Sequence, residues 1–97
     1  MKNIDPLSLD GHLLKLLITV VEKGSVTGAA NALDVTQSAV SHQIDRLRAL
    51  AGDALFVKSG RGIVPTARAE SLAVQARELL ERIQGFGKKQ VFEPAAL

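Results

Sequence analysis

The stretch Ser25-Val-Thr-Gly-Ala-Ala-Asn-Ala-Leu-Asp-Val-Thr-Gln-Ser-Ala-Val-Ser41 decides the fold of this chain. It contains two segments with helical patterns, and each follows a residue whose side-chain oxygen can cap the first turn of a helix. Ser25 precedes the first segment, residues 26–33, and Thr36 precedes the second, which runs to about Ala51. Because only two residues separate the first segment from Thr36, the sequence predicts two helices joined by a tight turn.

The two predicted helices carry different side chains. The first helix carries small residues, which allow close contact with another helix: Gly28, Ala29, Ala30 and Ala32. The second has an apolar face made by Val40, Ile44 and Leu47. Its opposite face is polar and consists of Gln37, Ser38, Ser41, His42 and Asp45.

Apolar stripes predict two further helices, one on each side of this pair. Residues 13–21 have helical spacing, and Gly24 is expected to stop the helix that they form. A fourth helix is expected after residues 65–66, with an apolar stripe along about twenty residues. The stripe consists of Leu72, Ala76, Leu79, Leu80 and Ile83. It suits a partner helix better than a closed core, and Gly85 and Gly87 are expected to end the helix.

A small β-hairpin is expected between the third and fourth helices. Gly52 ends the third helix, and two short runs with β-branched or aromatic residues follow at 54–57 and 63–64. A polar, glycine-containing turn at residues 58–62 joins the two runs.

Three helices followed by a β-hairpin wing make a winged helix-turn-helix, so the expected fold class is mainly α. Residues 1–65 form the expected winged domain, residues 66–87 a long dimerisation or linker helix, and residues 88–97 a linker toward a further domain. At 97 residues, of which 46% are hydrophobic, the chain has the size of a single compact unit.

Composition argues against several classes of protein. There is no cysteine, so we expect neither a disulfide nor a cysteine-based zinc site, no cofactor, and a cytoplasmic location. The two histidines fall on different predicted helices without an evident carboxylate partner, so an enzyme is not expected. The apolar run at 13–21 is shorter than the ~20 residues that span a bilayer, so no membrane partner is expected.

The net charge is only +2, but residues 36–68 carry five basic and two acidic side chains.

The polar face of residues 36–51 carries side chains that are able to contact bases, so we expect this helix to bind double-stranded DNA in the major groove. Gln37 can pair with adenine, and serine hydroxyls can donate or accept at several base positions. His42 can donate to guanine or contact a phosphate. The expected base contacts are Gln37, Ser38, Ser41, His42 and, from the wing, Arg61.

The glycine-rich turn at 58–62 is slim enough for the minor groove, where Arg61 would meet the negative potential of narrow A·T tracts. Other basic and hydroxyl side chains are placed to hold phosphates, which position a protein without reading sequence. The expected backbone contacts are Ser25, Thr36, Arg46, Arg48 and Lys58.

These residues also resemble a known family. The matching elements are Gly24-Ser-Val-Thr-Gly-Ala-Ala30, Leu33, Val35-Thr-Gln-Ser-Ala-Val-Ser41, Gln43-Ile44, Leu47, Leu55-Phe56, Gly60-Arg-Gly62 and Pro65-Thr66. From about Leu9 to Ile83 the chain resembles the amino-terminal domain of LysR-type transcriptional regulators. The resemblance implies a bacterial transcription factor that forms a homodimer through antiparallel pairing of its fourth helix, with the stripe listed above at the interface.

The sequence departs from the family pattern in two places. The position after Ser41 is frequently arginine in the family and is His42 here. Histidine is mostly uncharged at pH 7, so the contact at this point should be weaker than that of an arginine. Family members are also longer and carry an effector-binding domain, so a small-molecule inducer is expected only for that missing domain. The segment Phe92-Glu-Pro-Ala95 resembles the lead-in to it.

Two alternatives stay open. A winged helix can serve as a protein-interaction module, which an acidic or apolar outward face on the third helix would favour. The face that includes Gln37, Ser38 and Ser41 does not favour it. The fourth helix can also fold back on its own domain instead of pairing between chains.

Overall fold

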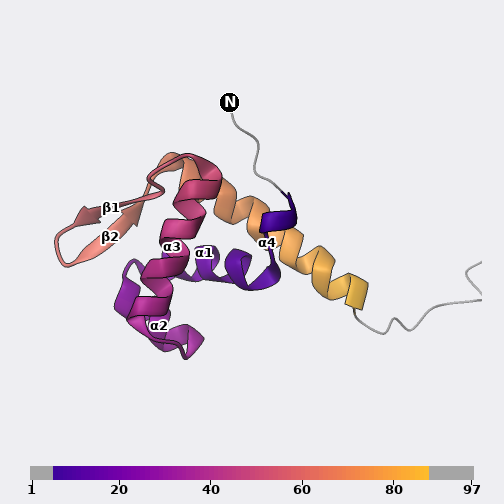
Figure 1. Cartoon of the computed structure of the whole chain (residues 1–97), viewed down its shortest axis with the longest axis horizontal. Helices are drawn as coiled ribbons and strands as arrows, with labels where there is room; N and C mark the ends of the chain where they lie inside the picture. The colour runs from indigo at the N-terminus through magenta and orange to yellow at the C-terminus, as the bar shows by residue number, and fades with distance from the viewer. Residues whose placement is uncertain (1–5, 88–97) are drawn as a thin grey trace, which may run out of the picture.

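The computed structural model describes residues 6–87 and has the architecture of a winged helix-turn-helix (Figure 1). The elements are a short 3-10 turn η1 (Pro6–Ser8), α1 (Gly11–Lys23), α2 (Val26–Leu33), α3 (Gln37–Ala51), β1 (Phe56–Ser59), β2 (Gly62–Pro65) and α4 (Ala67–Gly87). The expected mainly α fold is confirmed. The linker predicted at 88–97 lies outside the described residues.

A side-chain oxygen caps the N-terminus of each of the first three helices. Asp10, Ser25 and Thr36 each accept a hydrogen bond from the backbone N–H three residues later, at 2.8, 2.8 and 3.0 Å. These bonds satisfy donors that a helix otherwise leaves without partners at its first turn. Gly24 and Gly52 end α1 and α3 in the left-handed conformation. The caps predicted for α2 and α3 and the predicted ends of α1 and α3 are therefore confirmed.

The core is built from aliphatic side chains of every helix and of the loop before the wing, together with Phe56 of β1. One residue from each helix and one from the loop are 0% exposed, namely Val20 of α1, Ala29 of α2, Val40 of α3, Leu55 of the loop and Ala69 of α4. The small side chains of α2 let that helix lie close to both α1 and α3, which it contacts along its short length. Leu33 and other partly buried residues pack around this centre.

The turn of the wing is shorter than the sequence predicted. We expected residues 58–62 to form it, but Lys58 and Ser59 belong to β1, and Gly62 belongs to β2. Ser59 pairs with Gly62 in the antiparallel register, which leaves Gly60 and Arg61 as a two-residue connection. Gly60 supplies the positive φ, 59°, that such a tight connection requires. Arg61 therefore lies at the very tip of the wing.

Helix α4 covers, to within one residue, the range 66–87 that the sequence predicted for the long helix. Gly85 was expected to help break the helix but lies within it, and Gly87 is the last residue of the helix in the described range. A glycine in a helix interior weakens it by only about 1 kcal/mol relative to alanine, which does not suffice to stop a helix of 21 residues. In Figure 1, α4 runs away from the domain on the side opposite the wing.

The first half of α4 packs on its own domain. Ala69, Ala73 and Ala76 are buried in the core, and α1 is the main neighbour of the helix. Leu79 and Ile83, farther along, are 43% and 51% exposed. The apolar stripe of this helix therefore divides between its own core and an exposed end.

A polar network joins the loop before the wing to the start of α4. Asp53 Oδ2 accepts hydrogen bonds from Leu55 N at 2.7 Å and from Thr66 Oγ1 at 3.0 Å. Thr66 Oγ1 in turn accepts from Ala69 N at 3.1 Å, and Thr66 N donates to Leu55 O at 2.7 Å. Leu55 has φ 63°, a left-handed conformation that disfavours a branched side chain. Hydrogen bonds on both sides of Leu55 and its complete burial hold it there.

We expect Thr66→Val to lower the free energy of unfolding by about 1–2 kcal/mol, because it removes both the cap of α4 and the donor to Asp53 while keeping the side-chain shape. Urea denaturation followed by circular dichroism measures this. Thr66→Ser keeps the hydroxyl and should retain most of the stability. Equal stability of the valine and serine variants would contradict the role given to the hydroxyl.

Candidate nucleic-acid interface

The polar face of α3 is open to solvent. Ser38, Ser41, His42 and Asp45 are all exposed, on the side opposite the buried Val40, Ile44 and Leu47. Gln37 is exposed in the first turn of the helix. The structure therefore brings four of the five predicted base-reading residues together on one element, near its N-terminal end, where helices of this kind meet base edges.

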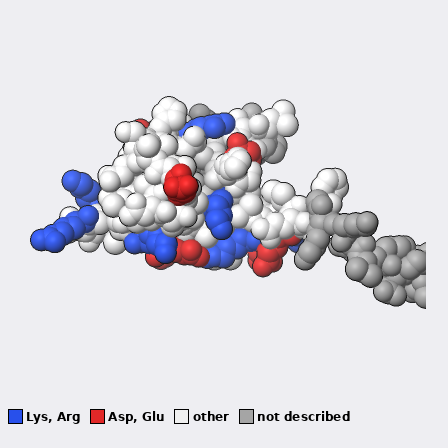
Figure 2. Space-filling model, turned by 90° about the horizontal axis from the view of Figure 1, so that it is seen from below, with Lys and Arg blue, Asp and Glu red and all other residues white. Residues whose placement is uncertain are grey.

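The fifth predicted base contact, Arg61, lies apart from α3, at the wing tip. Arg61 and Lys58 are both exposed. Figure 2 shows basic side chains projecting from the end of the molecule that carries the wing, whereas basic and acidic side chains lie interspersed along its lower edge in that view. The wing is thus a separate basic projection beside the polar helix.

The root of the wing touches the turn between α1 and α2. Ile63 N donates to Gly24 O at 3.0 Å. A Cβ atom at Gly62 would lie 2.5 Å from the same carbonyl oxygen, so only glycine allows the two backbones to come this close. The contact places the start of α2, with Ser25, next to the wing.

Two of the predicted phosphate-binding residues cap helices. The hydroxyl oxygens of Ser25 and Thr36 accept from backbone N–H groups, which leaves each hydroxyl hydrogen able to donate outward. Thr36 is exposed and Ser25 is half-buried. Arg46 is exposed on the flank of α3 near α1, where its Nη2 donates to Ser8 O at 3.4 Å.

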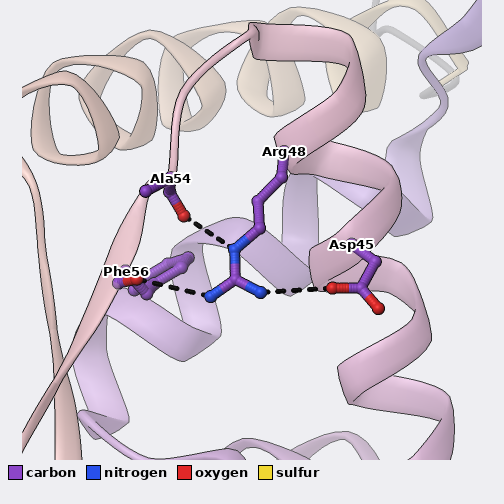
Figure 3. Close-up of polar contacts among 4 residues, drawn as sticks. All are labelled: Asp45, Arg48, Ala54 and Phe56. Atoms are coloured by element: carbon purple, nitrogen blue, oxygen red, sulfur yellow. Dashed lines mark hydrogen bonds and ion pairs between the residues drawn. The ribbon is translucent and has the colours of Figure 1, made fainter.

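Arg48, also predicted to hold phosphate, has partners within the chain. Its Nε donates to Ala54 O at 2.8 Å, its Nη2 to Phe56 O at 3.3 Å, and its Nη1 to Asp45 Oδ1 at 3.1 Å (Figure 3). The guanidinium thus links α3 to the loop and strand that begin the wing. Sequence reasoning missed this role, although the three-residue spacing of Asp45 and Arg48 was a signal for an ion pair on one helix.

The stripe predicted for a partner helix is unequally exposed. Ala76 is 1% exposed and lies in the core of its own chain. Leu72 and Leu80 are partly buried against that core, and Leu79 and Ile83 are largely exposed. Sequence reasoning missed Phe86, which is 94% exposed. Its seven-residue spacing from Leu79 was the available signal.

Other kinds of site are not evident in the part of the chain that the structure describes. Within residues 6–87, no three histidine, cysteine, aspartate or glutamate side chains lie close enough to hold a metal ion. None of the helices described in that range has the length and apolar character needed to cross a membrane.

An exposed polar α3, packed on a short α2 and flanked by a basic wing, defines a winged-helix DNA-binding domain. Residues 12–70 match the model of the bacterial regulatory helix-turn-helix proteins of the lysR family. This chain belongs to that family.

Similar proteins are transcriptional regulators. The HTH-type transcriptional regulator LeuO of Escherichia coli K12 is 40% identical over 88 residues, which are 91% of this chain and 28% of LeuO. The regulator LinR of Sphingobium indicum is 40% identical over 96 residues, 98% of this chain and 31% of LinR. The chain therefore spans less than a third of the length of either relative.

Solved structures with this fold include DNA complexes. The DNA-binding domain of CbnR in complex with DNA has a TM-score of 0.77 and 34% identity, with 81% of this chain and 91% of that chain covered. The DNA-binding domain of BenM on benA site 1 DNA has a TM-score of 0.74 and 27% identity, with 80% and 91% covered.

We expect His42→Arg to tighten DNA binding about tenfold and to shift base preference, because an arginine can form a paired contact with guanine that the histidine cannot. Selection from a randomised duplex pool, followed by titration of the selected duplexes, measures both effects.

His12→Arg is the matched control, because it adds the same charge at an exposed position of α1, outside the polar face of α3. That variant should leave base preference unchanged. If His42→Arg alters neither affinity nor preference, His42 does not contact a base.

Proposed function

We propose that this chain is the operator-reading module of a LysR-type bacterial transcription regulator, with α3 in the major groove of double-stranded DNA and the wing in the minor groove. The observation that carries the proposal is the exposed row of Ser38, Ser41 and His42 on α3. These short side chains let the helix backbone approach base edges, and their hydroxyl and imidazole groups can donate or accept there. The structures of the similar CbnR and BenM domains in complex with DNA support DNA as the partner.

Within this proposal, the remaining predicted contacts divide by position. Gln37 reads a base from the first turn of α3, and Arg61 enters the minor groove from the tip of the wing. Phosphates are held by the outward hydroxyl hydrogens of Ser25 and Thr36 and by the basic side chains of Arg46 and Lys58. Arg48 acts mainly as a positioning residue, because three of its nitrogen atoms already donate to Asp45, Ala54 and Phe56.

We also propose that the chain pairs with a second copy through the exposed end of α4. Leu72, Leu79 and Phe86 repeat every seven residues, the spacing of helices that pair side by side. Leu79 also lines an apolar groove of about 210 Å³ between α1, α3 and α4. Leu80 and Ile83 flank this row, and Ala76 supports it from within its own core.

The wider parts of the proposal concern the whole regulator. A small-molecule inducer, bound by a domain outside this one, and a cytoplasmic location where the regulator meets DNA both fit a relative of LeuO and LinR. A winged helix that binds another protein is the alternative, which the mostly neutral polar face of α3 does not favour.

The DNA affinity of the chain should fall steeply with salt, because each neutralised phosphate contributes a slope of about −0.9 in log affinity against log salt concentration. Lys58→Ala should make the slope shallower by about one phosphate. Arg77→Gln is the control, since Arg77 lies on α4, outside the predicted DNA contacts, and is paired with Glu22 at 3.2 Å. Fluorescence anisotropy with a duplex, at salt concentrations between roughly 50 and 200 mM, measures the slopes of the unchanged chain and of both variants. Failure to bind any duplex at low salt contradicts the proposed function.

Ile83→Glu should convert the dimer into a monomer, because it places a charge in the apolar contact between the two α4 helices. Val74→Glu is the matched control: Val74 is 54% exposed and lies nine residues away, on the opposite side of the helix. Sedimentation velocity over a range of protein concentrations distinguishes monomer from dimer. Equal behaviour of the two variants would remove the support for this interface.

A further inference from the structure

Asp45 lies on the exposed polar face of α3 but has no role in the DNA contacts proposed so far. It follows Ser41 by four residues and His42 by three, so all three side chains share one face of α3. Its side chain is 72% exposed. At 1.5 Å per residue it lies about 6 Å farther along the helix than Ser41, within the span of a helix seated in the major groove.

Arg48 fixes the orientation of this carboxylate. The guanidinium is itself held by the carbonyl oxygens of Ala54 and Phe56, and from that position it binds Asp45 Oδ1 (Figure 3). Asp45 Oδ2 accepts no hydrogen bond from residues 6–87. One carboxylate oxygen is thus used for positioning, and the other remains available to a ligand.

The same ion pair reduces the electrostatic penalty of bringing a carboxylate to DNA. An unpaired carboxylate on this face would be repelled by the phosphates on both sides of the groove. The Arg48 guanidinium, 3.1 Å from Oδ1, cancels the charge of the pair at short range. The face therefore presents a strong hydrogen-bond acceptor without a net negative charge.

The chemistry of the major groove selects what such an acceptor can bind. A carboxylate accepts hydrogen bonds and donates none, and the groove offers donors only at cytosine N4 and adenine N6. Adenine places its N7 acceptor beside N6, which repels a carboxylate, whereas cytosine places no acceptor of its own beside N4. Cytosine is therefore the base that suits Asp45.

We propose that Asp45, oriented by Arg48, accepts a hydrogen bond from the N4 amino group of a cytosine and so specifies one base of each half-site. This inference rests on the proposed function, because it requires α3 to lie in the major groove. It assigns Asp45 as a specificity-determining residue and Arg48 as its positioning residue.

Asp45→Asn separates this role from a purely structural one. Asparagine keeps an oxygen for Arg48, so its amide NH2 takes the place of Oδ2, and this donor cannot accept a hydrogen bond from cytosine N4 but can donate to an acceptor such as guanine O6 or N7. Selection of bound duplexes from a randomised pool should return a cytosine at one half-site position for the unchanged chain, and Asp45→Asn should lose this cytosine in favour of a base with an acceptor there, such as guanine. Asp45→Ala should lose discrimination at that position by about tenfold or more, with the other positions unaltered.

Asp34→Asn is the matched control, because it removes one exposed negative charge at the end of α2 and asparagine tolerates the left-handed conformation there. It should keep the cytosine. Circular dichroism and thermal unfolding of each variant report whether the fold persists. Asp45→Ser supplies a second small, polar replacement at this position.

The outcomes separate the two hypotheses. If the unchanged chain selects no sequence and binds no duplex, the proposed function fails and this inference fails with it. If the unchanged chain selects a sequence, and Asp45→Asn and Asp45→Ala select the same base as the unchanged chain at every position, the function stands and the inference is overturned. Tighter binding by both variants without any change in base preference overturns it as well, because Asp45 then only repels DNA.

Discussion

Burial of Val40, Ile44 and Leu47 against the rest of the core is the constraint on which the other features depend. A helix has a fixed period, so seating these three side chains obliges the residues between them to face outward. The core has no tryptophan or tyrosine, and its elements meet at small or medium aliphatic side chains. Such a core holds α3 close to α1 and α2 without covering the face of the helix that carries Ser38, Ser41 and His42.

Polar contacts help to set the position of the wing relative to α3. Arg48 reaches from α3 to the carbonyl oxygens of Ala54 and Phe56, and Asp53 reaches from the same loop to Thr66 at the start of α4. Leu55 between them is fully buried in a left-handed conformation that these bonds maintain. Helix α3 and the wing therefore share one polar junction, which also orients Asp45.

The sequence predicted the features that depend on neighbouring residues. The caps at Ser25 and Thr36 and the helix end at Gly24 were all visible in it, because each depends on a few adjacent positions. It did not predict the partners of Arg48, since Ala54 and Phe56 act through backbone carbonyls that carry no side-chain signal. It also assigned the whole apolar stripe of α4 to a partner helix. Burial of Ala69, Ala73 and Ala76 depends on where α1 lies, which no local pattern records.

The burial of the first half of α4 makes that helix a rigid extension of the reading domain. A pair of chains joined through the exposed half would hold its two α3 helices at a fixed distance from each other and in a fixed relative orientation. One base pair inserted between two half-sites turns the second by about 34° around the DNA axis and moves it about 3.4 Å away. A dimer of this design would therefore measure the length of its operator as well as read its bases.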